Sequence, residues 1–277
     1  MSSPLVQGWL YATVPIDNPQ GESGTGFLVF RSTDGEQGRV FLATNKHVVH
    51  KDDQLRTSVP HVTCHFNTVD TNGASGTLAG QVPLANTDGT KRYREHPDRD
   101  TDVLVVDVTD VMQLNPTIQR AWVAYDMFAD HTKREELDIT AGEEVIIIGY
   151  PLGLRQGATN FPLLRQGLIA TKIGTPIRDK LQVRGGTYRD RTLRAFLIDG
   201  GTVPGSSGSP VVLKPVIGRL VRNTIVMGTA PPVLLGIVAE TKYAPIDVGQ
   251  GVIPGFANLG LVFDVETVRE TIELFFP

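Results

Sequence analysis

The 277-residue chain has a single cysteine, Cys64, and no long apolar segment. One cysteine cannot form an intramolecular disulfide, so the fold must be held together without one. No apolar run approaches the roughly 18 residues that a membrane-spanning helix needs. The first basic residue is Arg31, so the start of the chain lacks the positive region of a signal peptide. We therefore expect a protein of a reducing compartment, the cytoplasm, with no membrane partner.

An excess of basic charge is also missing. The chain has 26 Lys and Arg against 30 Asp and Glu, which gives a formal net charge of −4. A protein that binds nucleic acid through a basic surface would show the opposite balance. Hydrophobic residues make up 40% of the chain, which is typical of a soluble globular protein with a normal core. We expect no nucleic-acid partner.

The chain does contain a series of short β-rich runs separated by turn residues. Each run is a few residues long and rich in Val, Ile and Phe, which is typical of strands. Long amphipathic segments do not alternate with these runs, which argues against a parallel α/β sheet. The runs are residues 26–30, 39–44, 103–108, 144–149, 195–199, 210–213, 234–239 and 259–263.

Two segments favour helices. Residues 264–275 begin with Asp264, a good N-cap residue, and continue with apolar residues at three- and four-residue spacing. Residues 111–137 are more polar and favour helix more than their surroundings. This second segment is interpreted as a connector between two β-rich halves.

The most unusual stretch is T-V-P-G-S-S-G-S-P-V-V, residues 202–212, where three serines lie among glycines and prolines. These residue types are common in surface turns, so a turn is the simplest interpretation of the stretch alone. A serine hydroxyl becomes a good nucleophile only when a neighbouring base takes its proton. A catalytic interpretation therefore requires a base, and an acid that orients the base, elsewhere in the chain.

Both partners are present upstream of this stretch. His47 follows an apolar run in L-A-T-N-K-H-V-V, and Asp102 precedes another apolar run in D-R-D-T-D-V-L-V-V. A buried carboxylate needs a hydrogen-bond partner, and a histidine N–H is a suitable one. The order His, Asp, Ser is that of the chymotrypsin-type triad, and differs from the orders of the subtilisins and the α/β-hydrolases.

Short motifs spread over nearly the whole chain form a consistent set. They are G-T-G-F (24–27), T-N-K-H-V-V, D-V-L-V-V, G-Y-P-L-G (149–153), P-G-S-S-G-S-P and N-L-G-L-V (258–262). In this order they resemble the trypsin-like serine peptidases, and most of all the bacterial high-temperature-requirement (Deg-type) branch. One departure is that the loop ends Gly208-Ser209-Pro210, where the family usually has Gly-Gly-Pro.

The resemblance implies roles for individual residues. Ser207 is the expected nucleophile, His47 its general base and Asp102 the residue that orients the base. The N–H groups of Gly205 and Ser207 are expected to form the oxyanion hole, where a glycine allows close approach of the substrate. Asp102 is preferred over its neighbours Asp98 and Asp100 because it directly adjoins the strand, as in the family. Ser206 and Ser209 are then scaffold residues.

The resemblance also implies an all-β fold of two six-stranded antiparallel barrels with a C-terminal helix. The catalytic cleft would lie between the barrels, and no cofactor is expected. The expected divisions are residues 1–112 for the first barrel, 113–137 for the connector, 138–263 for the second barrel and 264–277 for the helix.

The substrate pocket follows from the same resemblance. Its base is expected at Gly201 and Thr202, and one wall at Ala239, Glu240 and Thr241. No carboxylate stands where trypsins keep one, so we expect cleavage after small or medium apolar residues. The main objection to this apolar preference is Glu240, because its carboxylate could reach a basic side chain of the substrate. The expected partner is a protein or peptide substrate; a regulatory partner or self-association is left open.

Two rival functions belong to other classes. A catalytically silent binding module with the same fold would usually have lost one residue of the triad, and all three are present. A serine esterase of the α/β-hydrolase type needs a G-x-S-x-G motif, but the segment around Ser207 reads G-S-S-G-S.

Two further segments favour structural interpretations. In H-V-T-C-H, residues 61–65, the alternation of apolar residues predicts a strand, on which His61 and His65 would lie about 13 Å apart at roughly 3.3 Å per residue. A metal site there is therefore disfavoured. Residues 178–194 are locally basic and predict a solvated hairpin with its turn at Gly185-Gly186, although a regulatory contact is left open.

Overall fold

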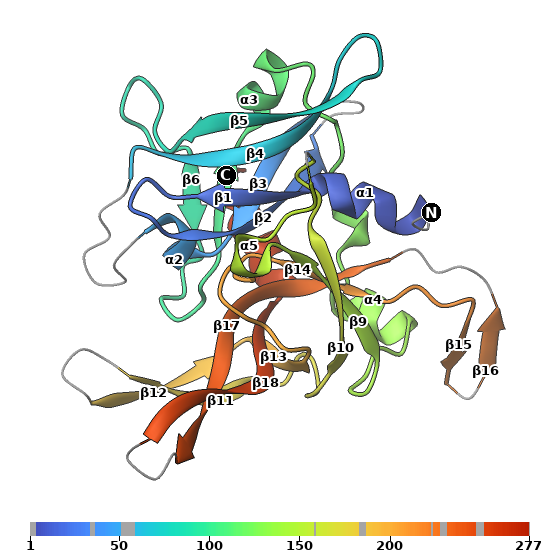
Figure 1. Cartoon of the computed structure of the whole chain (residues 1–277). Coiled ribbons are helices and arrows are strands. Elements are labelled where there is room, and N and C mark those ends of the chain that lie inside the picture. Colours follow the sequence, from blue (N-terminus) through green and yellow to red (C-terminus); the bar gives the residue numbers. More distant parts are fainter. Residues whose placement is uncertain are drawn as a thin grey trace.

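The computed structural model describes residues 4–33, 37–50, 59–157, 159–182, 187–222, 224–227, 232–247 and 252–276. The described chain is dominated by antiparallel strands, which form two β-rich halves one above the other in Figure 1. The all-β prediction is therefore confirmed.

The first half is one large sheet. Its strands run in the order β5-β4-β1-β2-β3-β7-β6, and β8 pairs with β2 in parallel. On β4, the side chains of Val62, Cys64 and Phe66 are buried in alternation with more exposed neighbours, as expected for a strand with one face on the core. The strands are β1 (Thr13–Asp17), β2 (Ser23–Ser32), β3 (Gly38–Thr44), β4 (His61–Val69), β5 (Ser75–Pro83), β6 (Tyr93–Glu95), β7 (Leu104–Asp107) and β8 (Val123–Ala124).

The second half contains a closed six-stranded antiparallel barrel, as predicted. Its strands follow the order β10-β13-β18-β17-β14-β9. They are β9 (Glu144–Gly149), β10 (Leu163–Ile169), β13 (Ala195–Asp199), β14 (Pro210–Leu213), β17 (Leu234–Asp247) and β18 (Val252–Asp264). In the first half we expected six strands, but the sheet contains eight in the described ranges. Two of the eight, β6 and β8, have three and two residues, too few for a hydrophobic pattern to reveal them.

Two hairpins stand out from the barrel (Figure 1). One pairs β11 (Ile177–Gln182) with β12 (Tyr188–Leu193), and the other pairs β15 (Gly218–Val221) with β16 (Thr224–Met227). The first confirms the hairpin predicted for residues 178–194. Its expected turn at Gly185-Gly186 lies outside the described residues.

Helices are few and short. Asp264 accepts a hydrogen bond from the Glu266 N–H at 3.1 Å and so caps the predicted C-terminal helix α5. The segment 111–137 is helical only in part, because β8 and a single 3₁₀ turn separate its two short helices. The helices are α1 (Pro4–Ala12), α2 (Lys46–Val49), α3 (Thr109–Leu114), α4 (His131–Glu136) and α5 (Val265–Glu273), with 3₁₀ turns η1 (Tyr125–Met127) and η2 (Pro151–Gly153). None of the helices in the described ranges is long and apolar enough to span a membrane.

One hydrophobic core joins the two halves. It contains Phe27 and Phe41 from the first sheet, Phe263 from the barrel and Ile272 from α5. Helix α5 is anchored to the first sheet by an ion pair between Glu273 and Arg31 at 2.8 Å. Burial of these large side chains stabilises both halves together. The shared core therefore fixes how the first sheet and the barrel are positioned relative to each other.

Candidate active site

Two neighbouring strands bring His47 and Asp102 to the same end of the first sheet. Strands β3 and β7 are antiparallel, and Thr44 pairs with Leu104 where β3 ends and β7 begins. His47 lies three residues after Thr44, on the single-turn helix α2, and Asp102 lies two residues before Leu104. Antiparallel pairing therefore places residues that are far apart in the chain side by side.

The Asp102 carboxylate holds His47 at two points. One oxygen, Oδ2, lies 2.5 Å from the ring atom Nδ1, and the other, Oδ1, accepts a hydrogen bond from the His47 backbone N–H at 3.2 Å. The buried Asn45 side chain donates to the Asp102 carbonyl oxygen at 2.6 Å. These contacts fix both the position and the plane of the imidazole ring.

The pKa of the Asp102 carboxyl lies below its ordinary value. Burial alone would raise this pKa, but the nearby charge of His47 and the hydrogen bonds from His47 and Lys46 outweigh it. Asp102 is therefore ionised at neutral pH and can only accept hydrogen bonds. The proton in the 2.5 Å contact then belongs to Nδ1 of His47.

The neighbouring carboxylates have other partners. Asp98 accepts hydrogen bonds from the Asp100 N–H and the Thr101 hydroxyl, both at 3.0 Å, which closes the turn before β7. Asp100 pairs with Arg189 on β12. Of the three aspartates weighed from the sequence, Asp102 is the one that faces His47.

The loop that carries Ser207 is shaped by two glycines in the left-handed region. Gly205 has φ +87° and Gly208 has φ +85°. A Cβ on Gly205 would lie 2.5 Å from the Tyr150 carbonyl oxygen, and one on Gly208 would lie 1.7 Å from the Thr25 carbonyl oxygen. Both positions thus require glycine for conformation and for space.

Thr25 on β2 attaches this loop to the first half. Its N–H donates to the Ser207 carbonyl oxygen at 2.8 Å, and its hydroxyl donates to the Gly205 carbonyl oxygen at 2.9 Å. The hydroxyl of Thr44, at the end of β3, donates to the Thr25 carbonyl oxygen at 2.8 Å. Ser207 is therefore tied to the strand that leads to His47. This segment is part of the G-T-G-F motif, but the sequence alone gives no sign that Thr25 has this role.

The N–H groups expected to form the oxyanion hole take no part in the hydrogen bonds that hold the loop. Within the described ranges, the N–H groups of Gly205 and Ser207 have no protein acceptor. The Ser207 hydroxyl donates to the Ala239 carbonyl oxygen on β17 at 3.3 Å. Ser206 and Ser209 are buried in the loop; Ser206 Oγ accepts a hydrogen bond from the Val203 N–H at 3.3 Å.

Comparison with known protein families agrees with this arrangement. A family model described as a trypsin-like peptidase domain matches residues 24–221, well over half of the chain. The chain belongs to the trypsin-like peptidase domain family. It is accordingly a serine endopeptidase by class, as the sequence predicted. No curated protein sequence matches the chain.

Solved structures from M. tuberculosis are similar to this chain. The Rv3671c protease from M. tuberculosis, in its active form, has 19% sequence identity and a TM-score of 0.50, with 97% of this chain and 82% of that chain covered. An inactive form from M. tuberculosis H37Rv has 17% identity and a TM-score of 0.48, covering 99% of this chain and 90% of that chain. A second inactive form has 18% identity and a TM-score of 0.49, covering 99% and 93%.

The residues expected at the substrate pocket lie on β17 and on the segment before the Ser207 loop. Ala239 accepts the hydrogen bond from Ser207, and Thr202 lies against Gly260, which pairs with Thr241 across β17 and β18. Gly201 has φ +53°, and a Cβ there would lie 2.7 Å from the Asn258 side-chain oxygen.

Glu240 is engaged by two basic side chains. Its carboxylate oxygens lie 2.7 Å from Arg191 Nη2 and 2.9 Å from Lys242 Nζ. Asp179 on β11 joins the same cluster, 2.6 Å from Arg191 and 2.7 Å from Lys242. Arg191 is only 8% exposed, so the basic hairpin is less solvated than predicted: its β12 strand packs against Glu240 on β17.

The predicted strand in H-V-T-C-H is confirmed as part of β4, with His61 and His65 at positions four residues apart. His65 Nε2 lies 2.6 Å from a carboxylate oxygen of Asp17. In the described part of the chain, no group of three or more His, Cys, Asp or Glu side chains is arranged to hold a metal ion.

Replacing Gly208 by alanine should destabilise the peptidase. Alanine in the left-handed region costs about 1–2 kcal/mol, and the clash with the Thr25 carbonyl oxygen should add about 1–3 kcal/mol. Gly21 is a matched control because it has φ +93° and nothing within 4 Å of a Cβ. Urea denaturation should show a larger loss of unfolding free energy for Gly208→Ala than for Gly21→Ala. Equal losses would mean that the close approach to Thr25 is wrong.

Proposed function

We propose that the protein hydrolyses peptide bonds through an acyl-enzyme, with Ser207 as nucleophile, His47 as general base and Asp102 as its orienting acid. The observation that carries the proposal is the two-point contact between Asp102 and His47, next to a loop that Thr25 ties to the same sheet. A surface turn would need neither feature.

The proposed reaction begins with proton transfer from the Ser207 hydroxyl to Nε2 of His47. To do this the hydroxyl turns away from the Ala239 carbonyl oxygen, its acceptor at 3.3 Å; catalytic hydrogen bonds commonly tighten only when substrate binds. Oγ then attacks the carbonyl carbon of the substrate, and the carbonyl oxygen takes the negative charge. Asp102 stabilises the imidazolium that forms.

The developing oxyanion would accept hydrogen bonds from the N–H groups of Gly205 and Ser207. Donors that are already oriented need no rearrangement during the reaction, and each is worth about 3–4 kcal/mol in the transition state. His47 next gives its proton to the leaving amine, which breaks the peptide bond and leaves an ester on Ser207. A water molecule, activated by His47, hydrolyses the ester and restores the enzyme. No cofactor enters the scheme.

The alternative is a catalytically silent binding module with the same fold. It would keep the substrate groove but not the chemistry. The pairing of Asp102 with His47 and the open N–H groups of Gly205 and Ser207 favour the enzyme, because a binding module needs neither.

The nucleophile can be tested directly. A fluorophosphonate probe should label Ser207 alone, and Ser207→Ala should lower kcat by on the order of 10⁴- to 10⁶-fold while the protein stays folded. Ser209→Ala serves as the matched control, because its hydroxyl is buried in the same loop, and it should keep the labelling. Labelling at Ser206 or Ser209, or an active Ser207→Ala variant, would refute the assignment.

Asp102→Asn should lower kcat by about 10⁴-fold, because an amide can no longer hold His47 in the tautomer with the proton on Nδ1. Asp98→Asn is the comparison, since it changes a carboxylate of the same turn that does not face His47. Its effect on kcat should be small. The measurement is kcat from steady-state kinetics on a peptide substrate. A larger loss of kcat in Asp98→Asn than in Asp102→Asn would assign the orienting role to Asp98 instead.

We also propose that Gly201, Thr202, Ala239, Glu240 and Thr241 form the pocket for the residue before the cleaved bond, and that it takes small or medium apolar side chains. Arg191 and Lys242 already neutralise Glu240, which leaves little negative charge to attract a basic side chain. Profiling with a peptide library should show apolar cleavage sites for the wild type. Glu240→Gln should change the discrimination between basic and apolar residues by no more than about fivefold. Strict cleavage after Arg or Lys would overturn this proposal.

A further inference from the structure

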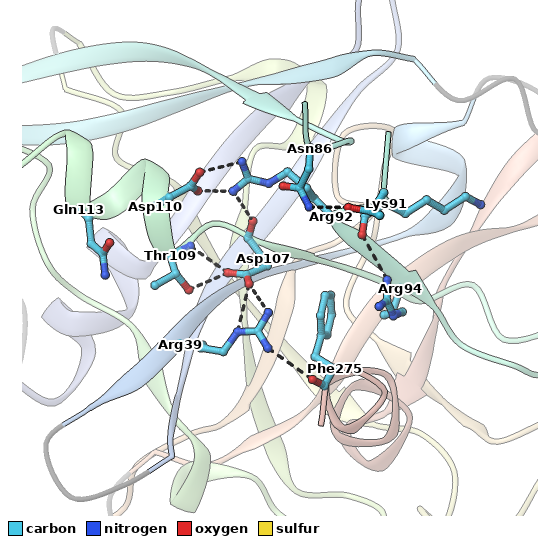
Figure 2. Close-up of a pocket in the computed structure, with 11 residues that line it drawn as sticks. Arg39, Asn86, Lys91, Arg92, Arg94, Asp107, Thr109, Asp110, Gln113 and Phe275 are labelled. Atoms are coloured by element: carbon cyan, nitrogen blue, oxygen red, sulfur yellow. Dashed lines mark hydrogen bonds and ion pairs between the residues drawn. The ribbon is translucent and has the colours of Figure 1, made fainter. Parts of the chain in front are cut away.

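The two strands that lead to the proposed catalytic pair are fixed to each other at the ends far from it. Figure 2 shows Arg39 of β3 reaching the carboxylate of Asp107 on β7, with which it forms an ion pair. At the near end, the pairing of the two strands stops where β3 ends and β7 begins. His47 and Asp102 lie beyond the last paired residues, so their relative position depends on contacts outside the sheet.

Helix α2, which carries His47, has a single turn and cannot hold its own position. Such a short helix is unstable in isolation, and Asn45 at its start makes no capping hydrogen bond with its side chain. The end of α2 is fixed, because the Asn18 side chain donates to the Val49 carbonyl oxygen at 2.8 Å and Val48 is buried. The start of the helix, where His47 lies, needs anchors of its own.

Asp102 lies near the end of the turn between β6 and β7. The His96 N–H donates to the Val103 carbonyl oxygen at 3.0 Å and closes the base of this turn. Inside the turn, the Asp98 N–H donates to Nδ1 of the buried His96 at 3.1 Å, and the Thr101 N–H donates to the Asp98 carbonyl oxygen at 3.2 Å. These contacts shape the turn, but they do not attach it to α2.

Lys46, the residue before His47, attaches the turn to α2. Its ammonium group donates to the carbonyl oxygens of His96 and Asp98, both at 3.1 Å. Its backbone N–H also forms a hydrogen bond with the Asp102 carboxylate. One residue of α2 therefore contacts the base, the middle and the end of the turn. Hydrogen bonds from a charged donor are stronger than those between neutral groups, so this link resists displacement of Asp102.

The neighbouring contacts of the turn have a shorter reach or another direction. The Asn45 side chain donates to the Asp102 carbonyl oxygen at 2.6 Å, at the end of the turn. The ion pair of Asp100 with Arg189 ties the turn to the second half of the molecule. The contacts of Lys46 extend to residues on the far side of Asp100, so they restrain the turn as a whole against α2.

We propose that Lys46 is a positioning residue for the proposed triad: by fixing the turn against α2, it holds the Asp102 carboxylate where it can orient His47. This proposal rests on the proposed function, because it gives Lys46 a part in the same reaction. Lys46 acts through the turn and Asp102, and it is not one of the residues proposed to bind the substrate.

Steady-state kinetics on a peptide substrate test the proposal. Lys46→Met removes the ammonium group but keeps an unbranched side chain. It should lower kcat by about 10- to 100-fold, because small displacements of a catalytic group are costly. KM should stay unchanged, because the proposed pocket is intact. Lys46→Arg should restore most of kcat, since a guanidinium group can also donate to two carbonyl oxygens.

Lys133→Met is the matched control. Lys133 is also partly buried, and its ammonium group donates to the Asp126 carbonyl oxygen at 2.8 Å, in the connector between the two halves. This variant loses a hydrogen bond of the same kind and should keep the kcat of the wild type. Urea denaturation verifies that both Met variants are folded under the conditions of the assay.

A measurement without substrate separates this proposal from the proposed function. The proton between His47 Nδ1 and Asp102 Oδ2, which lie 2.5 Å apart, should give a proton NMR signal far downfield that disappears in Asp102→Asn. Lys46→Met should shift or broaden this signal, whereas Lys133→Met should keep it. An inactive wild type would contradict the proposed function, and the signal would still test Lys46. An unchanged signal in Lys46→Met, or a kcat equal to that of the wild type, would overturn the proposal for Lys46.

Discussion

The geometry of the active site depends on the hydrogen bonds of one buried residue, Thr25. Its N–H and hydroxyl hold the carbonyl groups of Ser207 and Gly205, and its hydroxyl accepts a hydrogen bond from the Tyr150 N–H at 3.1 Å. Thr25 belongs to the first sheet, while its partners in the loop and at Tyr150 belong to the second half. Each half supplies part of the proposed chemistry, so a rigid link between them is required if His47 and Ser207 are to meet. Burial of a shared hydrophobic core holds two surfaces in contact but is not directional. Hydrogen bonds are directional, so they fix the relative position of the two surfaces.

This close contact explains the composition of the loop around Ser207. Gly208 leaves room for the Thr25 carbonyl oxygen, and Gly149 leaves room for Ser209, whose Oγ would lie 1.9 Å from a Cβ at position 149. The serine at 209, where the family usually has glycine, therefore fits because the opposing residue on β9 has no side chain. Ser209 is completely buried. The departure from the family motif is thus accommodated inside the scaffold, away from the N–H groups of Gly205 and Ser207.

Much of the fold was predictable because its strands have clear local signals. The runs at 144–149, 195–199 and 210–213 coincide with β9, β13 and β14, and Asp264 caps α5 as expected. The candidate residues His47 and Asp102 could be chosen because each adjoins an apolar strand. Contacts between distant segments leave no local pattern, so the role of Thr25 and the burial of Arg191 could not be predicted.

The cluster of aspartates before β7 shows how tertiary contacts divide tasks among similar residues. Asp98 closes the turn, Asp102 faces His47, and Asp100 pairs with Arg189 on the hairpin of the second half. The hydrogen bond from Arg189 holds the pKa of Asp100 below its ordinary value, so the pair is charged at neutral pH. The same β12 strand places Arg191 against Glu240 on β17, one of the residues proposed for the substrate pocket. One hairpin therefore contacts both the turn before Asp102 and Glu240 on β17. The hydrogen bonds of Thr25 and the ion pair of Arg189 with Asp100 therefore connect the two halves at two separate places.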